Sequence, residues 1–236
     1  MTFTIVAKCP TTDQIGVGIA TYSLGVGGYC PFFARGRAAL STQAFANPRL
    51  GPIAIKALED GAAPEAALAA LEAIDPGYSY RQVCIVDGSG AVAMHTGADT
   101  RPWSGHRVGK GYAAFGNVLA GAATVDAIQA AFEASAGAPL AERLLRAIEA
   151  GRDAGGQAGA DGAHLNERSA ALLVQGDDIA RDINLRVDLH EDAVTELRRV
   201  YERYAPYLDY YALRADDPAR TPAQDAFARA NNLPVN

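Results

Sequence analysis

The chain has 236 residues, of which 49% are hydrophobic and 20% are charged, so it is long enough to bury a substantial core as one large globular domain. Its formal net charge of -6 argues against nucleic acid and anionic membranes as main partners, because both select basic surfaces. Since no apolar run reaches membrane-spanning length and the N-terminus lacks the features of a signal peptide, we expect a cytoplasmic protein with reduced thiols at Cys9, Cys30 and Cys84.

The chain begins with a run of β-branched and aromatic residues, which predicts a strand over residues 1–7. A turn-rich cluster leads to a second predicted strand over residues 15–21, so an antiparallel hairpin is expected. A glycine-rich loop over residues 23–28 precedes a third strand over residues 38–44. Thr2 is therefore expected at the edge or the mouth of the hairpin.

A pair of helices and then more strands follow. The predicted elements are the helices 52–60 and 64–74 and the strands 82–87, 91–96 and 112–115. The order then recurs with the helices 124–136 and 139–151, a loop expected to be mobile at 153–162, the strands 170–174 and 183–189, and a last helix from about Glu191. Runs of strands separated by helix pairs favour antiparallel sheets with helices packed outside. We predict an α+β fold in which two such units stack as a four-layer αββα sandwich.

The second residue of the chain is the first candidate for chemistry. Initiator methionine is generally removed before a residue as small as threonine, and the mature chain then begins at Thr2. A free α-amine has a reference pKa of about 7.7 to 8.0, so it can accept a proton near neutral pH. Thr2 therefore carries a nucleophile and a base in one residue. The alternative is an N-terminal strand that only pairs into a sheet.

Polar side chains also gather at the ends of the predicted strands. They are Thr21, Ser23, Gln43, Asn47 and Asn117, with Arg35 and Arg37 ahead of the third strand. Backbone amides and Asn or Gln side chains at such positions can face a ligand. Alternatively, these residues are turn and cap residues, which is the usual role of Asn and Ser.

Other chemical motifs are weaker. The glycine-rich stretch at residues 105–114 has neither the spacing of a phosphate loop nor the strand-to-helix context of a dinucleotide fingerprint. The four histidines lack metal-ligand spacing and are expected to be surface or hydrogen-bonding residues. Cys30 beside Arg35 is a conceivable nucleophile, but a buried inert thiol is favoured.

The order of several segments resembles a known family. These segments are residues 1–7, 15–20, 41–48, 81–82, 95–97, 103–106, 116–121, 168–173 and 186–188. Together they resemble a widespread bacterial family of unknown function that is grouped by fold with the N-terminal-nucleophile hydrolases. The resemblance covers roughly residues 1–200. Members of that family typically carry a bulky basic residue where this chain has Tyr22 and Ser23, so pocket chemistry can differ there.

The resemblance implies a hydrolase of a carbon–nitrogen bond in a small amide or peptide-like substrate. Thr2 is then the nucleophile, and Arg35 or Arg37 lowers its pKa. A backbone amide near Gln43 or Ala44, with the side chain of Asn47 or Asn117, stabilises the oxyanion. Thr21, Ser23, Ala44 and Asn47 are the expected substrate-binding residues, and no metal or organic cofactor is required. The competing interpretation is a noncatalytic small-molecule-binding or assembly protein that keeps Met1.

The C-terminal part of the chain is rich in tyrosine. Five of the ten tyrosines lie between Tyr201 and Tyr211, and tyrosine is enriched at protein interfaces. We predict a hydrolase-like domain over residues 1–190 and a C-terminal helix with an aromatic tail over residues 191–236. The tail packs on its own domain or, as we expect, joins subunits of a homodimer or larger homo-oligomer through residues 201–213.

Overall fold

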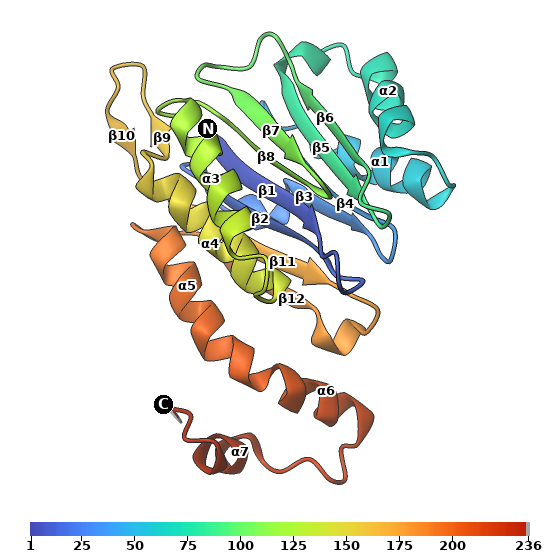
Figure 1. Ribbon diagram of the computed structural model, residues 1–236, viewed down its shortest axis with the longest axis vertical. Helices are drawn as coiled ribbons and strands as arrows, with labels where there is room; N and C mark the ends of the chain where they lie inside the picture. The colour runs from blue at the N-terminus through green and yellow to red at the C-terminus, as the bar shows by residue number, and fades with distance from the viewer. Residues whose placement is uncertain (235–236) are drawn as a thin grey trace.

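A computed structural model describes residues 1–234 and contains two main antiparallel sheets (Figure 1). The larger sheet has the strand order β12-β11-β2-β1-β8-β7 and the smaller one β3-β4-β5-β6. The strands of the larger sheet are β1 (Thr2–Lys8), β2 (Ile15–Thr21), β7 (Gly105–Gly109), β8 (Tyr112–Asn117), β11 (Ser169–Gln175) and β12 (Ile183–Val187). Those of the smaller sheet are β3 (Pro31–Ala34), β4 (Ala38–Ala44), β5 (Arg81–Asp87) and β6 (Val92–Thr96). The predicted α+β class with antiparallel sheets is confirmed.

The helices pack on these sheets in separate groups. The helices are α1 (Leu50–Glu59), α2 (Pro64–Ile74), α3 (Ala122–Ala134), α4 (Leu140–Asp153), α5 (Ala193–Tyr204), α6 (Leu208–Asp216) and α7 (Gln224–Ala230). Helices α1 and α2 contact the smaller sheet, whereas α3, α4 and α5 contact the larger one. Within residues 1–234 no helix is both long enough and apolar enough to cross a membrane.

Three hydrophobic clusters fill the spaces between these elements. One lies between the larger sheet and its helices and includes Phe3 and Leu144, both fully buried. A second joins the two sheets and includes Val6 and Phe115. The third lies between the smaller sheet and α1 and α2, around Leu71. Alternate residues of β1 therefore face opposite sides of its sheet, as the two-residue period of a strand requires.

Strand β1 lies inside the larger sheet and pairs with β2, the next strand of the chain, and with β8, which is more than a hundred residues away. Thr2 is opposite Thr21 of β2 on one side and opposite Asn117 of β8 on the other. Strand β2 in turn pairs with β11. The sheets therefore do not come from two successive units of the chain, and the predicted division into such units is wrong. Local sequence patterns do not predict long-range strand pairing, because a hairpin has the same sequence pattern whichever sheet it joins.

Two edge strands were missed in the sequence. Strand β3 has only four residues and begins at Pro31, which has no N–H to donate and therefore suits an edge. Strand β7 contains Gly105, His106 and Arg107 and shows no apolar alternation. The stretch predicted as a mobile loop over residues 153–162 contains β9 (Gln157–Ala158), which pairs with β10 (His164–Leu165).

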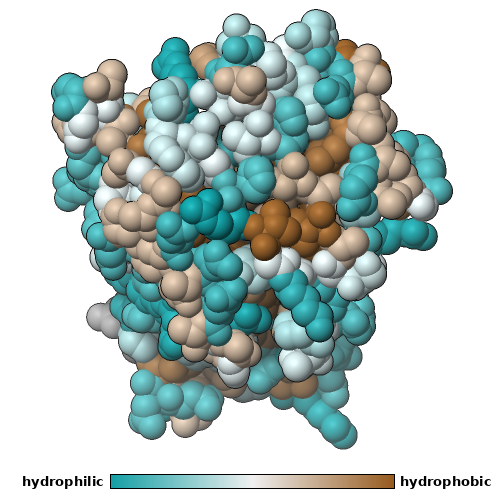
Figure 2. Space-filling view, turned by 45° about the horizontal axis from the view of Figure 1, so that its top comes forward, coloured by the Kyte–Doolittle hydropathy of each residue, from teal (hydrophilic) through white to brown (hydrophobic). Residues whose placement is uncertain are grey.

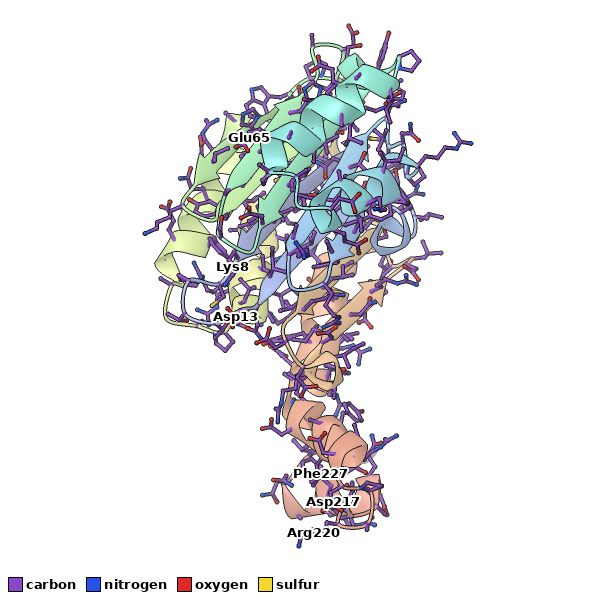
Figure 3. The ribbon with its side chains drawn as sticks, turned by 90° about the vertical axis from the view of Figure 1, so that its right-hand side faces the viewer. Lys8, Asp13, Glu65, Asp217, Arg220 and Phe227 are labelled. Atoms are coloured by element: carbon purple, nitrogen blue, oxygen red, sulfur yellow. The ribbon has the colours of Figure 1, made fainter. Side chains whose placement is uncertain are left out.

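The C-terminal helices extend beyond the sheets. Asp192 caps α5 by accepting from the Thr195 N–H at 3.1 Å, and Val194 and Leu197 are fully buried in the core. Figure 3 shows Phe227, Asp217 and Arg220 in the projecting segment. The Phe227 ring lies 4.6 Å from that of Tyr210, so α6 and α7 already give the tail aromatics a partner. Assembly through residues 201–213 and the domain boundary near residue 190 stay predictions.

Candidate functional site

The space between the two sheets is apolar at one end and polar at the other. Val6, Val17 and Val86 belong to its apolar part. The polar side chains at the Thr2 end are buried, and they are Thr2, Thr4, Thr21, Ser41, Gln43, Gln82, Asn117 and Ser169. Burying polar groups costs free energy unless they are hydrogen-bonded, so such a cluster requires an explanation. Figure 2 turns the upper end of Figure 1 toward the viewer and shows a hydrophobic patch bordered by hydrophilic side chains.

The chain terminus is seated in this polar end. The Met1 α-amine donates to Asn117 Oδ1 at 2.7 Å. Thr2 Oγ1 lies 3.2 Å from Thr21 Oγ1, and the Thr2 residue is only 6% exposed. The Thr21 hydroxyl also donates to the carbonyl oxygen of Met1. The peptide bond between Met1 and Thr2 therefore lies within a set of hydrogen-bonding side chains.

Gln82 determines which atom Asn117 presents to the amine. Gln82 Nε2 donates to the carbonyl oxygens of Gly116 at 3.0 Å and Gly105 at 3.3 Å, which can only accept. Gln82 Oε1 must then accept, and Asn117 Nδ2 donates to it at 3.1 Å. The other amide atom of Asn117, its oxygen, is thereby directed at the α-amine. The Asn117 amide nitrogen is occupied by Gln82 and only its oxygen faces the amine, so the expectation that this side chain donates to an oxyanion is corrected.

The same network extends across both sheets. Gln43 Nε2 donates to Gln82 Oε1 at 2.9 Å, and Gln43 Oε1 accepts from the Thr4 hydroxyl at 2.6 Å. On the other side Thr96 Oγ1 lies 3.1 Å from Gln82 Nε2, sharing its two hydrogens with the two carbonyls, and 3.0 Å from His106 Nδ1. A connected network of this kind gives each member a single orientation, because every donor needs its acceptor.

Burial changes the acidity of the α-amine. Desolvation, with a smaller contribution from the nearby Arg101, lowers the Met1 amine pKa from 8.0 to about 6. The amine is therefore mostly uncharged at neutral pH and has a lone pair to accept a proton. Burial raises the pKa of the Cys30 thiol to about 12, so this group is uncharged and is not an effective nucleophile.

The amine pKa predicts a pH dependence of stability for the chain that keeps Met1. The unfolded chain binds the proton below about pH 8 and the folded chain only below about pH 6. Protonation therefore penalises the folded state, and the penalty is complete below pH 6. The free energy of unfolding is expected to rise by roughly 2 kcal/mol from pH 6 to pH 8. Urea unfolding across this range measures it, and a chain acetylated at Met1 is the control. An equal rise in the acetylated chain would contradict the assignment.

Two cavities meet at Met1. The smaller has a volume of about 150 Å³ and is lined by Met1, Ser23, Ala44, Phe45, Arg101, Asn117 and Val118. The larger has a volume of about 590 Å³ and extends from Met1 along Trp103 and Leu119 to the β9–β10 ribbon. Met1 and Arg101 line both cavities. Both cavities therefore border the residue directly before Thr2, and Thr2 itself lines neither of them.

The backbone around the smaller cavity is strained at two positions. Ala44 has a φ of 72° and Val118 a φ of 55°, in the left-handed region. This conformation is unfavourable for a residue with a side chain and most of all for a β-branched valine. Such residues cost about 1–3 kcal/mol each and cluster at functional sites. Both strained residues line the cavity beside Met1.

Most of the predicted site residues meet at this end of the sheets. Thr2, Thr21, Gln43 and Asn117 belong to the buried polar cluster, and Ser23 and Ala44 line the smaller cavity. Ser23 is held in place because its N–H donates to Thr21 Oγ1 at 3.3 Å and its carbonyl accepts from Ser169 at 2.8 Å.

Three predicted residues lie elsewhere. Arg35 is exposed, donates to the Gly176 carbonyl at 2.9 Å and pairs with Asp182. It follows β3 at the Ala38 end of β4, roughly 20 Å from the Ala44 end by the rise of a strand. Arg37 lies at the same far end, so neither arginine is beside Thr2 and that expectation is corrected. Asn47 accepts from the Arg49 N–H at 3.3 Å in the turn before α1, as a turn residue does.

Two residues of the site were missed in the sequence. Gln82 is a polar residue next to an apolar one in a strand, a pattern that usually marks a solvent-facing position. In the folded protein this position is buried, because the second sheet covers it. Arg101 lies in the loop before β7 and carries no pattern of its own. Within residues 1–234 no three His, Cys, Asp or Glu side chains are grouped so as to hold a metal ion.

Comparisons with known proteins agree with this structure. The model of a family described as "Family of unknown function (DUF1028)" matches residues 2–197. The chain is similar to the crystal structure of protein SPO2555 from Silicibacter pomeroyi, also assigned to DUF1028. The two are 31% identical, with a TM-score of 0.78 over 89% of this chain and 93% of that one. A comparison with curated proteins found no match. The family match spans both sheets and the Thr2 site, and the chain therefore belongs to the DUF1028 family.

Proposed function

We propose that this protein is an amide hydrolase that uses Thr2 as an N-terminal nucleophile once Met1 has been removed. The observation that carries the proposal is the position of Thr2, which lies in a central strand, buried in the polar end between the sheets and directly after Met1, a residue that lines two cavities. We further propose that the two sheets and their helices are the four-layer αββα sandwich of the N-terminal-nucleophile hydrolases.

In the proposed reaction Thr2 Oγ attacks the carbonyl carbon of the substrate amide. The α-amine of Thr2 takes the hydroxyl proton and then gives it to the leaving nitrogen as the C–N bond breaks. Water next hydrolyses the ester left on Thr2 and restores the free hydroxyl. Burial of the terminus favours this role, because it keeps an amine uncharged and able to accept a proton.

The proposed oxyanion donors differ from the side chains expected in the sequence. The Thr21 hydroxyl donates to the Met1 carbonyl, so loss of Met1 frees it for a substrate carbonyl. A backbone N–H at the strained end of β4, near Ala44, is the second proposed donor. One preorganised donor is worth about 2.7–4 kcal/mol in known enzymes. Asn117 accepts from the Met1 amine and is the proposed acceptor for the Thr2 amine once Met1 is removed, and the Asn117 side chain is in turn bonded to Gln82.

A second candidate function is a noncatalytic binding protein that keeps Met1. It is favoured by the hydrogen bond from the Met1 amine to Asn117 and by the burial of Thr2, which leave the terminus well satisfied as it stands. In that case the cavities on either side of Met1 are the binding site, and Thr2 serves only to pair β1 with its neighbours.

Intact mass separates the two functions. We expect protein purified from cells under native conditions to lack the mass of one methionine and to begin at Thr2. The control is a variant with Thr2→Lys, because a bulky second residue prevents removal of the initiator methionine and the variant must keep Met1. A native chain that retains Met1 throughout would refute the hydrolase and leave the binding protein.

A further inference from the structure

The two cavities at Met1 share the positive charge of Arg101 although the protein is acidic. The chain has 27 acidic and 21 basic residues. No aspartate or glutamate side chain lines either cavity. The groups there that can carry charge are the α-amine and Arg101. An anionic group on a ligand is therefore attracted to this site and meets no opposing carboxylate.

Arg101 is placed to receive such a group. Its carbonyl accepts from the Val118 N–H at 3.2 Å, which ties the Arg101 backbone to the strained residue beside the amine. Its guanidinium carbon lies 5.1 Å from the centre of the Phe45 ring, a cation–π distance that restricts the side chain. Within residues 1–234 Arg101 forms no ion pair, in contrast to Arg81, which is bound to Asp75 at 2.8 Å.

The chemistry of one guanidinium favours a carboxylate. Arginine presents paired N–H groups that match the two oxygens of a carboxylate, and the pairing fixes orientation as well as charge. In an N-acyl amino acid, or at the C-terminal residue of a peptide, one carbon separates the carboxylate from the amide nitrogen. The charged group and the scissile bond then both lie near the smaller cavity, where Arg101 and the chain terminus meet.

We propose that Arg101 binds the α-carboxylate of an N-acyl amino acid or of the C-terminal residue of a short peptide, and this substrate class rests on the proposed hydrolase function. The larger cavity takes the apolar part of the same molecule, since Trp103, Leu119 and Leu165 line it. Arg101 is thus a specificity-determining residue that selects an amide with a free carboxylate beside it.

Binding tests the proposal without requiring turnover. The protein is the full chain with Thr2→Ala, which prevents hydrolysis. The probes are a mixture of the N-acetyl derivatives of the twenty amino acids and the matching mixture of their C-terminal amides, observed by saturation-transfer NMR. We expect at least one free acid to bind and its amide to bind at least tenfold more weakly. Arg101→Gln should lower the affinity for the acid at least tenfold and leave the affinity for the amide unchanged.

Arg37→Gln is the matched control, because it removes an arginine from the far end of β4. It should change neither affinity. The proposal is overturned if no free acid binds at millimolar concentration, if acid and amide bind equally, or if Arg101→Gln binds the acid as before. If free acids bind selectively but the native protein does not hydrolyse them, the role of Arg101 is supported. Only the proposed hydrolase function is then contradicted.

Discussion

Replacing Thr2 with alanine is expected to lower kcat/KM for amide hydrolysis by at least about a thousandfold, because it removes the attacking oxygen and leaves only binding and the oxyanion donors. The variant should stay folded, since the hydroxyl makes one bond, at 3.2 Å to Thr21. The assay follows release of free amine from N-acyl amino acids, and the melting temperature is measured on the same samples.

Two variants make this result specific. Thr2→Ser keeps a hydroxyl beside the amine and should retain measurable activity. Thr12→Ala removes an exposed threonine from the opposite end of the first hairpin and should leave the rate unchanged. If Thr2→Ala hydrolyses a substrate at the native rate, Thr2 has no place in the mechanism.

Replacing Gln82 with leucine is expected to lower the free energy of unfolding by about 3 kcal/mol or more. Gln82 is fully buried and satisfies the carbonyl oxygens of Gly105 and Gly116 together with donors from Gln43 and Asn117. Leucine fills a similar volume but leaves the side-chain amide nitrogens of Gln43 and Asn117 without their acceptor. Each unsatisfied buried group costs about 1–3 kcal/mol. Urea unfolding measures the loss.

The same substitution at Gln224 is the control for Gln82. Gln224 is exposed and has one long hydrogen bond, at 3.5 Å to the Tyr211 hydroxyl. Its replacement by leucine should change stability by less than about 0.5 kcal/mol. A loss below 1 kcal/mol for Gln82→Leu would mean that the network relaxes and that Gln82 does not hold Asn117.

Local patterns in the sequence predict much of this fold. The β-branched run at the start of the chain predicts β1, and its two-residue alternation places Thr2 and Thr4 on the face opposite Phe3. The hairpin turns and helix caps are equally local signals. The sequence predicts β2 as one neighbour of β1, but it does not show that the other neighbour is β8, which lies more than a hundred residues away.

The site was predicted only in part, because some of its residues are brought together by long-range contacts. Asn117 and Gln43 stand at strand ends, where a polar residue is conspicuous. Arg35 resembles a site cation in sequence, but its position at the end of β3 takes it to Asp182. Arg101 lies near Met1 because the loop that carries it folds back beside the end of β8. No local sequence pattern predicts this course of the loop.

The pairing of β1 with β8 also affects when the terminus can be processed. Thr2 reaches its place only after residue 117 has left the ribosome, and its β2 neighbour is completed by β11, near residue 175. During synthesis the start of the chain can pair with β2 but lacks its β8 partner for many seconds, at about 5–20 residues per second. An aminopeptidase has access to Met1 in that interval and loses it when the sheet closes. Under the proposed mechanism, removal of Met1 by a processing enzyme competes kinetically with folding. Chains that fold before Met1 is removed remain inactive.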